Sequence, residues 1–141
     1  MSVEQNKATL KRIYDEVWNK GNTSLIPELV SPAFFTRGLH KNLSGHQGYT
    51  EMVTRLRAGM PDVHFTIDEA VGEGDNLVYR ITGEGTYRGK KYRWTQALFT
   101  SYQEGKVAEA LSISDNLPWY QPLGTPPPSY ELANEPSIET G

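Results

Sequence analysis

The spacing of apolar residues along the chain changes once, near residue 60. Before that point apolar residues recur every three or four positions, which predicts amphipathic helices. Ser2 and Gln5 have the spacing of a capping box, and Gly21 suits the end of a helix. We therefore predict a first helix over residues 2–20. Its apolar stripe consists of Leu10, Ile13, Tyr14, Val17 and Trp18.

Two further helices are expected in the first half. A short one starts at residue 23 or 24 and ends at residue 30, because a serine and a proline follow at 31 and 32. A short strand over residues 33–37 then runs into a loop. Ser44 and Gln47 have capping-box spacing once more, and they open a third helix that ends before Pro61.

After residue 60 the apolar positions alternate with polar ones, which is typical of strands. Strands are expected over residues 63–71, 77–87, 92–102 and 105–115, with short turns between them that imply antiparallel hairpins. Glycines within a strand, at 83 and 85, indicate a sharp bend or close packing. The order of elements predicts an α+β fold: three N-terminal helices packed on the concave face of a strongly curved, mostly antiparallel sheet. Such a cone-shaped α+β barrel leaves a pocket.

Length and composition reduce the number of functional classes to which the protein can belong. The 141 residues suit one domain, and a net charge of −3 argues against nucleic-acid and anionic-membrane partners. The chain has no cysteine, so disulfides and thiolate chemistry are excluded. Its polar N-terminus lacks a signal peptide, and no apolar run is long enough to span a bilayer, so a soluble cytoplasmic protein is expected. Residues 1–124 form the expected domain, and the proline-rich residues 125–141 an extended or disordered tail.

The last predicted strand carries the first candidate for chemistry. Strict alternation places Asp115 on the same face as Leu111 and Ile113, where an unpaired carboxylate is costly to bury. Such surroundings raise a carboxyl pKa, as proton transfer requires, but capping of the following turn explains Asp115 equally well. Glu109 lies about 20 Å away along the strand, too far for a paired-carboxylate mechanism. The opposite face is uniformly small: Ala108, Ala110, Ser112 and Ser114.

Other polar residues are weaker candidates. Gln96 interrupts the aromatic face of the third predicted long strand, and a buried amide needs partners, so it is a candidate donor to a ligand carbonyl. Tyr87 lies beside a glycine and is a candidate cavity residue. No metal site is expected, because the three histidines match no metal-ligand spacing. A polar pocket mouth is the remaining possibility, built from Arg37, His40, His46 and Tyr49.

Several separated segments together resemble one family. They are residues 13–21, 45–48, 60–65, 74–78, 85–89 and 105–109, with Asp115 and residues 122–124 at the end. Over residues 6–124 the chain resembles the SnoaL-like polyketide cyclases, also called ester cyclases, of the nuclear-transport-factor-two-like superfamily. The resemblance implies a small α+β barrel with a deep pocket, no metal or cofactor, and a homodimer formed through the sheet. It also implies that Asp115 is the general acid/base of an intramolecular aldol closure.

The chain departs from the family pattern at several positions. Arg37 and Tyr87 stand where histidines are frequent, Leu111 replaces a tryptophan, and no histidine lies near Ser101. The hairpin loop over residues 88–91 is also short. A pocket of tyrosines, one amide and one carboxylate suits acid-assisted epoxide opening or a pericyclic ring closure as well as an aldol reaction.

Three hypotheses follow. The first is a cofactor-free cyclase for a hydrophobic polyketide-like or prenylated small molecule, in which Asp115 transfers protons and Gln96, Tyr49 and Tyr87 hydrogen-bond the substrate. The second is an epoxide-opening enzyme, for which His46 would be the second catalytic group across the pocket. The third is a non-catalytic binding module. In the first hypothesis the apolar wall consists of Trp94, Trp18, Tyr14 and Met52.

Overall fold

The computed structural model describes residues 2–37 and 43–114. Helix α1 (Val3–Arg12) begins at the predicted capping box: Ser2 Oγ accepts from Gln5 N at 3.1 Å, and Gln5 Oε1 accepts from Ser2 N at 2.9 Å. The helix continues as a π-helix, η1 (Ile13–Trp18), and the chain turns at Gly21, whose φ is +75°. The first predicted helix is therefore confirmed, with a widened last part.

The next elements follow the predicted order. A 3₁₀ turn, η2 (Thr23–Leu25), leads into α2 (Ile26–Leu29), and β1 (Val30–Arg37) starts three residues earlier than expected. Pro32 is tolerated in β1 because this strand lies at the edge of the sheet. Helix α3 (Gly45–Gly59) follows, but the Ser44 side chain makes no capping hydrogen bond. The second capping-box prediction was therefore wrong, although the helix starts where it was expected.

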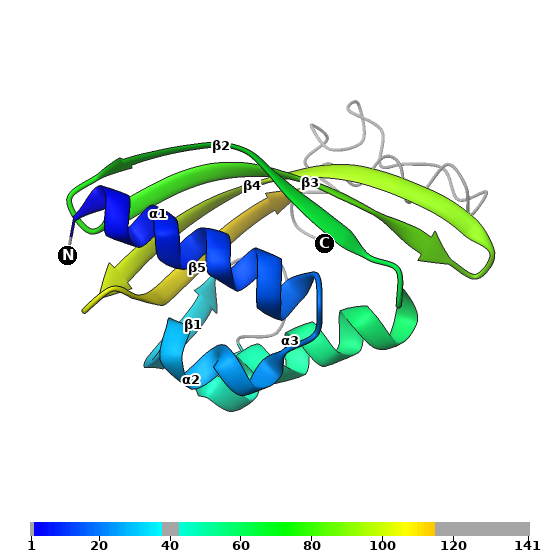
Figure 1. Ribbon diagram of the computed structural model, residues 1–141, viewed down its shortest axis with the longest axis horizontal. Helices are drawn as coiled ribbons and strands as arrows, with labels where there is room; N and C mark the ends of the chain where they lie inside the picture. The colour runs from blue at the N-terminus through cyan, green and yellow to red at the C-terminus, as the bar shows by residue number, and fades with distance from the viewer. Residues whose placement is uncertain (1, 38–42, 115–141) are drawn as a thin grey trace, which may run out of the picture.

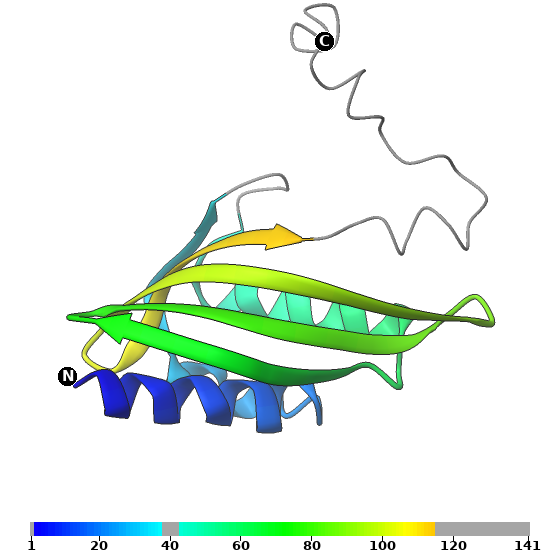
Figure 2. The ribbon, with the colours of Figure 1, turned by 90° about the horizontal axis from the view of Figure 1, so that it is seen from above.

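The remaining chain forms a meander of long strands, β2 (His64–Glu73), β3 (Asn76–Tyr87), β4 (Lys90–Gln103) and β5 (Lys106–Ser114). Two-residue turns join them. The sheet order is β1-β5-β4-β3-β2, and all neighbours are antiparallel except β1 and β5, which run parallel (Figures 1 and 2). The predicted hairpins are confirmed.

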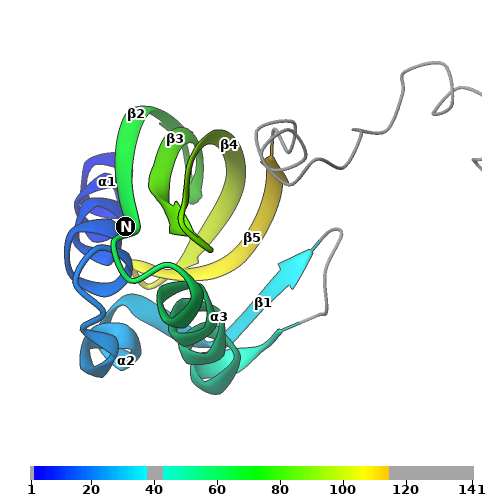
Figure 3. The same ribbon diagram turned by 90° about the vertical axis from the view of Figure 1, so that its right-hand side faces the viewer.

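The sheet is strongly curved, and helices α1, α2 and α3 lie on its concave side (Figure 3). The core lies between them, and its largest fully buried side chains are Phe34, Ile13, Ile26, Met60 and Leu77. The predicted α+β class is confirmed. Among the described residues, no helix has the length and apolarity needed to cross a membrane.

The two strand glycines make room for large side chains. A Cβ on Gly83 would collide with the Trp94 ring, and one on Gly85 would collide with the Met60 side chain. The expectation of close packing at these positions is thus confirmed. On the other face of β3, Arg80 bonds to Glu69 on the neighbouring strand at 3.1 Å.

Candidate active site

A cavity of about 570 Å³ lies between the concave face of the sheet and the helices. This volume falls within the range of small-molecule sites. Its lining is mostly apolar, and it draws on the helices and on all five strands. The lining residues are Leu10, Ile13, Tyr14, Trp18, Phe34, Thr36, Leu43, Tyr49, Met52, Arg55, Leu56, Phe65, Tyr79, Ile81, Trp94, Gln96, Leu98, Thr100, Val107, Ala110, Ser112 and Ser114.

Aromatic rings build one end of the cavity around Phe65. Its ring centroid lies 5.6 Å from that of Tyr14, 5.7 Å from that of Trp18 and 5.8 Å from that of Trp94, all edge to face. These contacts join η1, β2 and β4 into one wall. The four residues predicted for the apolar wall all line the cavity: Trp94, Trp18, Tyr14 and Met52.

The end of η1 is tied to β2 through Asn19. Its Nδ2 donates to Phe65 O at 3.0 Å, and its Oδ1 accepts from Phe65 N at 2.7 Å. Arg57 of α3 donates to Trp18 O at 2.9 Å from the other side. These bonds hold the Trp18 and Phe65 side chains at the cavity from three different elements.

A bulge in β5 decides which residues face the cavity. Tyr102 pairs with Val107 but Ser101 pairs with Glu109, so Ala108 is an extra residue in the strand. After the bulge, Ala110, Ser112 and Ser114 line the cavity together with Val107, whereas Ile113 is 57% exposed on the outer face. The predicted faces of this strand were therefore wrong: the small residues line the cavity, and Ile113, from the face expected to be buried, points outward.

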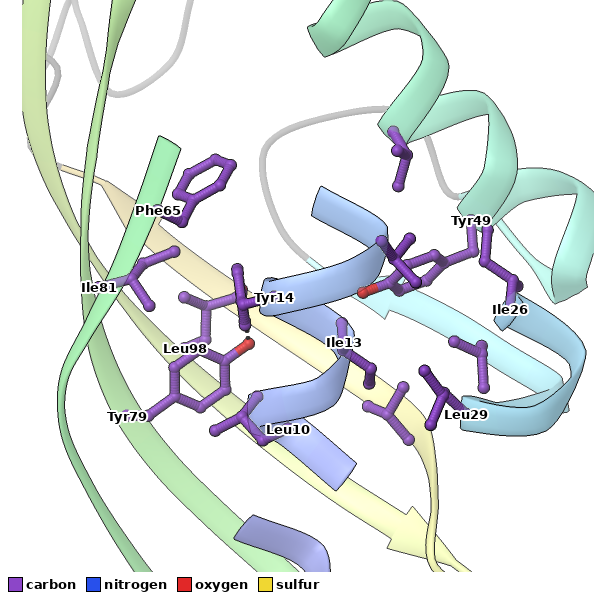
Figure 4. Close-up of a cluster of buried hydrophobic side chains, with 14 of the residues drawn as sticks. Leu10, Ile13, Tyr14, Ile26, Leu29, Tyr49, Phe65, Tyr79, Ile81 and Leu98 are labelled. Atoms are coloured by element: carbon purple, nitrogen blue, oxygen red, sulfur yellow. Dashed lines mark hydrogen bonds between the residues drawn. The ribbon is translucent and has the colours of Figure 1, made fainter. Parts of the chain in front are cut away.

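Two tyrosines meet at the cavity from opposite layers, Tyr14 from η1 and Tyr79 from β3 (Figure 4). Their hydroxyl oxygens lie 2.9 Å apart, and both residues are buried. Burial raises the pKa of each well above the ordinary value of a tyrosine. The pair is therefore neutral at physiological pH, and it binds as phenol rather than phenolate.

Tyr49, a predicted catalytic residue on α3, also lines the cavity. Its hydroxyl oxygen accepts a hydrogen bond from Trp18 Nε1 at 2.8 Å. Burial is the largest influence on Tyr49 and raises its pKa, while the bond from Trp18 lowers it. Tyr49 is thus a neutral hydroxyl donor at the cavity wall.

Gln96 lies at the cavity as predicted, but protein groups occupy both ends of its amide. Oε1 accepts from Trp94 Nε1 at 2.9 Å, and Nε2 donates to Ser112 Oγ at 2.9 Å. The amide holds Ser112 in place across β4 and β5. Sequence reasoning did not single out Ser112, because strict alternation placed it away from the pocket.

Other predicted site residues lie elsewhere. His46 Nε2 donates to Val30 O at 2.7 Å and joins α3 to β1, away from the cavity lining. Tyr87 is not a lining residue either; its ring lies 6.3 Å from that of Tyr92 and close to Gly59. Both placements correct the prediction of a pocket position. Arg37 ends β1. His40 and Asp115 lie outside the described residues.

Charge is nearly absent from the described wall of the cavity. Arg55, on α3, is the one charged side chain among the described lining residues, and it pairs with Glu51. Within residues 2–37 and 43–114, no carboxylate or histidine lines the cavity, and no three His, Cys, Asp or Glu side chains gather as a metal site. Sequence reasoning missed Arg55, whose helical spacing from Met52 was its only signal.

The family model of the SnoaL-like polyketide cyclases matches residues 8–123, and the chain belongs to this family. A candidate polyketide cyclase from Bacillus cereus ATCC 10987 is 27% identical, with a TM-score of 0.77, covering 88% of this chain and 85% of that one. No curated protein matches the chain.

Two more distant structures share the fold. A candidate SnoaL-like polyketide cyclase from Jannaschia sp. CCS1 is 21% identical, has a TM-score of 0.77 and covers 90% of this chain and 98% of that one. AclR, a candidate hydroxylase from Streptomyces galilaeus, has the same identity and TM-score, and the match covers 89% of this chain and 100% of that one. The family supports a cyclase-type enzyme.

Proposed function

We propose that the protein closes a ring in a polyketide-like or prenylated, largely apolar intermediate bound in the 570 Å³ cavity, with Asp115 as general acid/base. The observation that carries the proposal is the cavity itself: it is apolar, it has a few fixed hydroxyl groups, and the chain belongs to the SnoaL-like family. The choice of Asp115 rests on the family resemblance, because this residue, which follows the end of β5, lies outside the described residues.

An aldol closure fits these groups chemically. A carboxylate removes the proton from a carbon between two carbonyls, and the resulting enolate carbon forms a bond to a ketone carbon of the same molecule. The ketone oxygen takes up a proton as its double bond opens. No atom is gained or lost, so the product is an isomer of the substrate and no oxidant or reductant is consumed.

The tyrosines do not supply the base in this scheme. Tyr14, Tyr49 and Tyr79 have raised pKa values because they are buried, so they stay protonated where a general base works. Arg55 is a cation. The described wall thus lacks a base near neutral pH, and this supports the assignment to Asp115, which lies outside the described residues.

The two other hypotheses receive less support. Epoxide opening requires a second carboxylate or histidine across the pocket, and none lines the described wall, since His46 bonds to Val30 instead. A collapsed cavity together with an Asp115 that only caps its turn would favour the non-catalytic module; the cavity is open, and Asp115 lies outside the described residues. We therefore do not propose either as the main function.

The test is Asp115→Asn, with Glu109→Gln as the matched control because Glu109 is not a lining residue. Aromatic polyketides that carry a 1,3-dicarbonyl side chain serve as substrates, and liquid chromatography with mass spectrometry detects a product of unchanged mass. Asp115→Asn is expected to lower the rate by about 10²–10⁴-fold, while Glu109→Gln retains it. Full turnover by a folded Asp115→Asn variant would contradict the assignment of Asp115 as the general acid/base.

A further inference from the structure

The two tryptophans at the cavity fix the direction of the hydrogen bonds that begin at them. An indole nitrogen carries a proton and no free lone pair, so it only donates. Any oxygen bonded to it must accept, and the remaining groups of that residue are ordered accordingly. Trp18 and Trp94 each start such a chain of bonds at the cavity wall.

The first chain has two members and lies on the helical side. Trp18 Nε1 donates to the Tyr49 hydroxyl oxygen at 2.8 Å. The Tyr49 hydroxyl proton is then left over, and within the described residues no hydrogen bond takes it. Tyr49 is 6% exposed and lines the cavity, so this proton is available to a molecule bound there.

The second chain has three members and lies on the sheet. Trp94 Nε1 donates to Gln96 Oε1 at 2.9 Å, which assigns the other end of the amide as the NH₂ group. That group donates to Ser112 Oγ at 2.9 Å. The Ser112 hydroxyl proton is again left over, since no group in the described part of the chain receives it.

We propose that these two chains, ending at Tyr49 and Ser112, make the cavity a hydrogen-bond-donating site that binds its ligand through carbonyl oxygens from two opposite walls. Tyr49 and Ser112 touch the ligand, whereas Trp18 and Gln96 are positioning residues that direct the two hydroxyl groups. The ligand class is an apolar ring system with at least two carbonyl groups.

The hydroxyl group of Thr36 on β1 also accepts a hydrogen bond from the protein. Its hydroxyl oxygen accepts from Leu43 N at 3.3 Å, and Thr36 also lines the cavity. Arg55 offers only donors. These groups match carbonyl oxygens.

The inference deepens the proposed function. Removing a proton from the carbon between two carbonyls moves negative charge onto their oxygens. Donors already directed at those oxygens bind them more tightly as that charge develops, and this lowers the barrier to enolate formation. Probe binding is measured without turnover, so the two proposals can fail separately.

The test compares two probes of nearly equal shape, 2-methyl-1,4-naphthoquinone with two carbonyls and 2-methylnaphthalene with none. The absence of cysteine from the chain removes the usual thiol target of the quinone. NMR titration of the full-length protein follows the indole N–H signals of Trp18 and Trp94, which lie at the site. The quantity measured is the ratio of the two affinities, because damage to the cavity alone would weaken both probes together.

Tyr49→Phe and Ser112→Ala are each expected to lower this ratio roughly threefold to tenfold, and the double variant more than either single one. Gln96→Met keeps the side-chain length but frees Ser112, so it is expected to lower the ratio by less than Ser112→Ala does. Circular dichroism checks that each variant is folded.

A ratio that changes less than twofold in both single variants overturns the proposal, whether or not the double variant folds. Glu109→Gln is the second control, because Glu109 is not a lining residue, and it is expected to leave the ratio unchanged. Probe binding that follows the expected pattern without ring closure on any substrate would contradict the proposed function alone.

Discussion

The two faces of the sheet have opposite characters although they alternate along the same strands. On the inner face of β4, Trp94 and Leu98 are at most 9% exposed, and helices cover them. On the outer face, Phe99 of β4 is 46% exposed and Ile113 of β5 is 57% exposed. Inner polar groups such as Gln96 and Ser112 are hydrogen-bonded to each other at the cavity wall, whereas outer ones such as Arg80 and Glu69 form solvent-exposed ion pairs.

This difference indicates that the groups that determine ligand specificity lie on the inner face of the sheet. Burial removes the competition of water, so a fixed donor or ring on the inner face has a large effect on stability and binding. Exposed pairs such as Arg80 with Glu69 are weakened by water and salt. Changes on the inner face are therefore expected to have larger effects than matched changes on the outer face.

The largest effect of the buried inner groups is expected on folding stability at alkaline pH. Burial raises the pKa of Tyr102 to about 12 and the pKa values of Tyr14, Tyr49 and Tyr79 further. An unfolded tyrosine ionises near pH 10, so the unfolded state loses protons that the folded state keeps. Stability is untouched below about pH 10 and lost as the pH rises from there through the folded pKa values, by about 5 kcal/mol per pH unit.

Urea denaturation at a series of pH values measures this slope. Tyr14→Phe removes one of the four groups and is expected to reduce the slope by about 1.4 kcal/mol per pH unit. A stability that stays level from about pH 10 to 11 would contradict the burial of these hydroxyl groups.

Truncating a ring on each face gives the next contrast. Phe65, on the inner face, is 5% exposed and touches three other rings, so Phe65→Ala is expected to cost about 3–5 kcal/mol. Phe99 on the outer face is about half exposed, and Phe99→Ala is expected to cost less than about 1 kcal/mol. Chemical denaturation at low protein concentration measures both.

The same pair of variants bears on the homodimer that the family resemblance implied. If two copies pair through the outer face, the Phe99→Ala cost rises with protein concentration, because association stabilises only the folded form. Sedimentation of the unmodified protein and of Phe99→Ala reports this directly. Equal costs at low and high concentration would argue against a dimer through Phe99.

A smaller effect is expected from adding one methyl group at Gly83. Its Cβ would collide with the Trp94 ring, so Gly83→Ala is expected to cost about 1–3 kcal/mol. Thr82→Ala, on the outer face of the same strand, is the control and is expected to cost less than about 1 kcal/mol. A Gly83→Ala variant as stable as the unmodified protein would mean that the Trp94 ring moves freely.

The smallest effect is expected for the surface ion pair. Arg80 is half exposed and bonds to Glu69, so Arg80→Ala is expected to cost less than about 1 kcal/mol, and less still in high salt. Thermal denaturation with and without added salt measures it. A cost above about 2 kcal/mol would show that the two faces differ less than described.

Much of the fold follows from the period of the apolar residues. The change from helical to twofold spacing near residue 60 marks the transition from helices to the meander, and the aromatic face of β4 was predicted because β4 alternates without interruption over its whole length. Capping at Ser2 was predictable because both of its bonds are local. These features depend on residues close together in the sequence.

The cavity wall was harder to predict because it depends on how strands pair. One unpaired residue, Ala108, reverses the alternation in β5, and no local sequence signal marks a bulge at an alanine. The partners of Arg80 and His46 likewise come from neighbouring elements. The catalytic role of Asp115 stays a prediction.

The bulge at Ala108 also determines how the cavity tolerates changes in length. Loss of the single codon for Ala108 would make the pairs Tyr102–Val107 and Ser101–Glu109 consecutive, so the side chains that follow would keep their faces. Ala110, Ser112 and Ser114 would stay on the cavity wall, with Ser112 still beside Gln96. The cavity lining is thus expected to tolerate the loss of this one residue, because the bulge takes up the extra length without moving the groups of the wall.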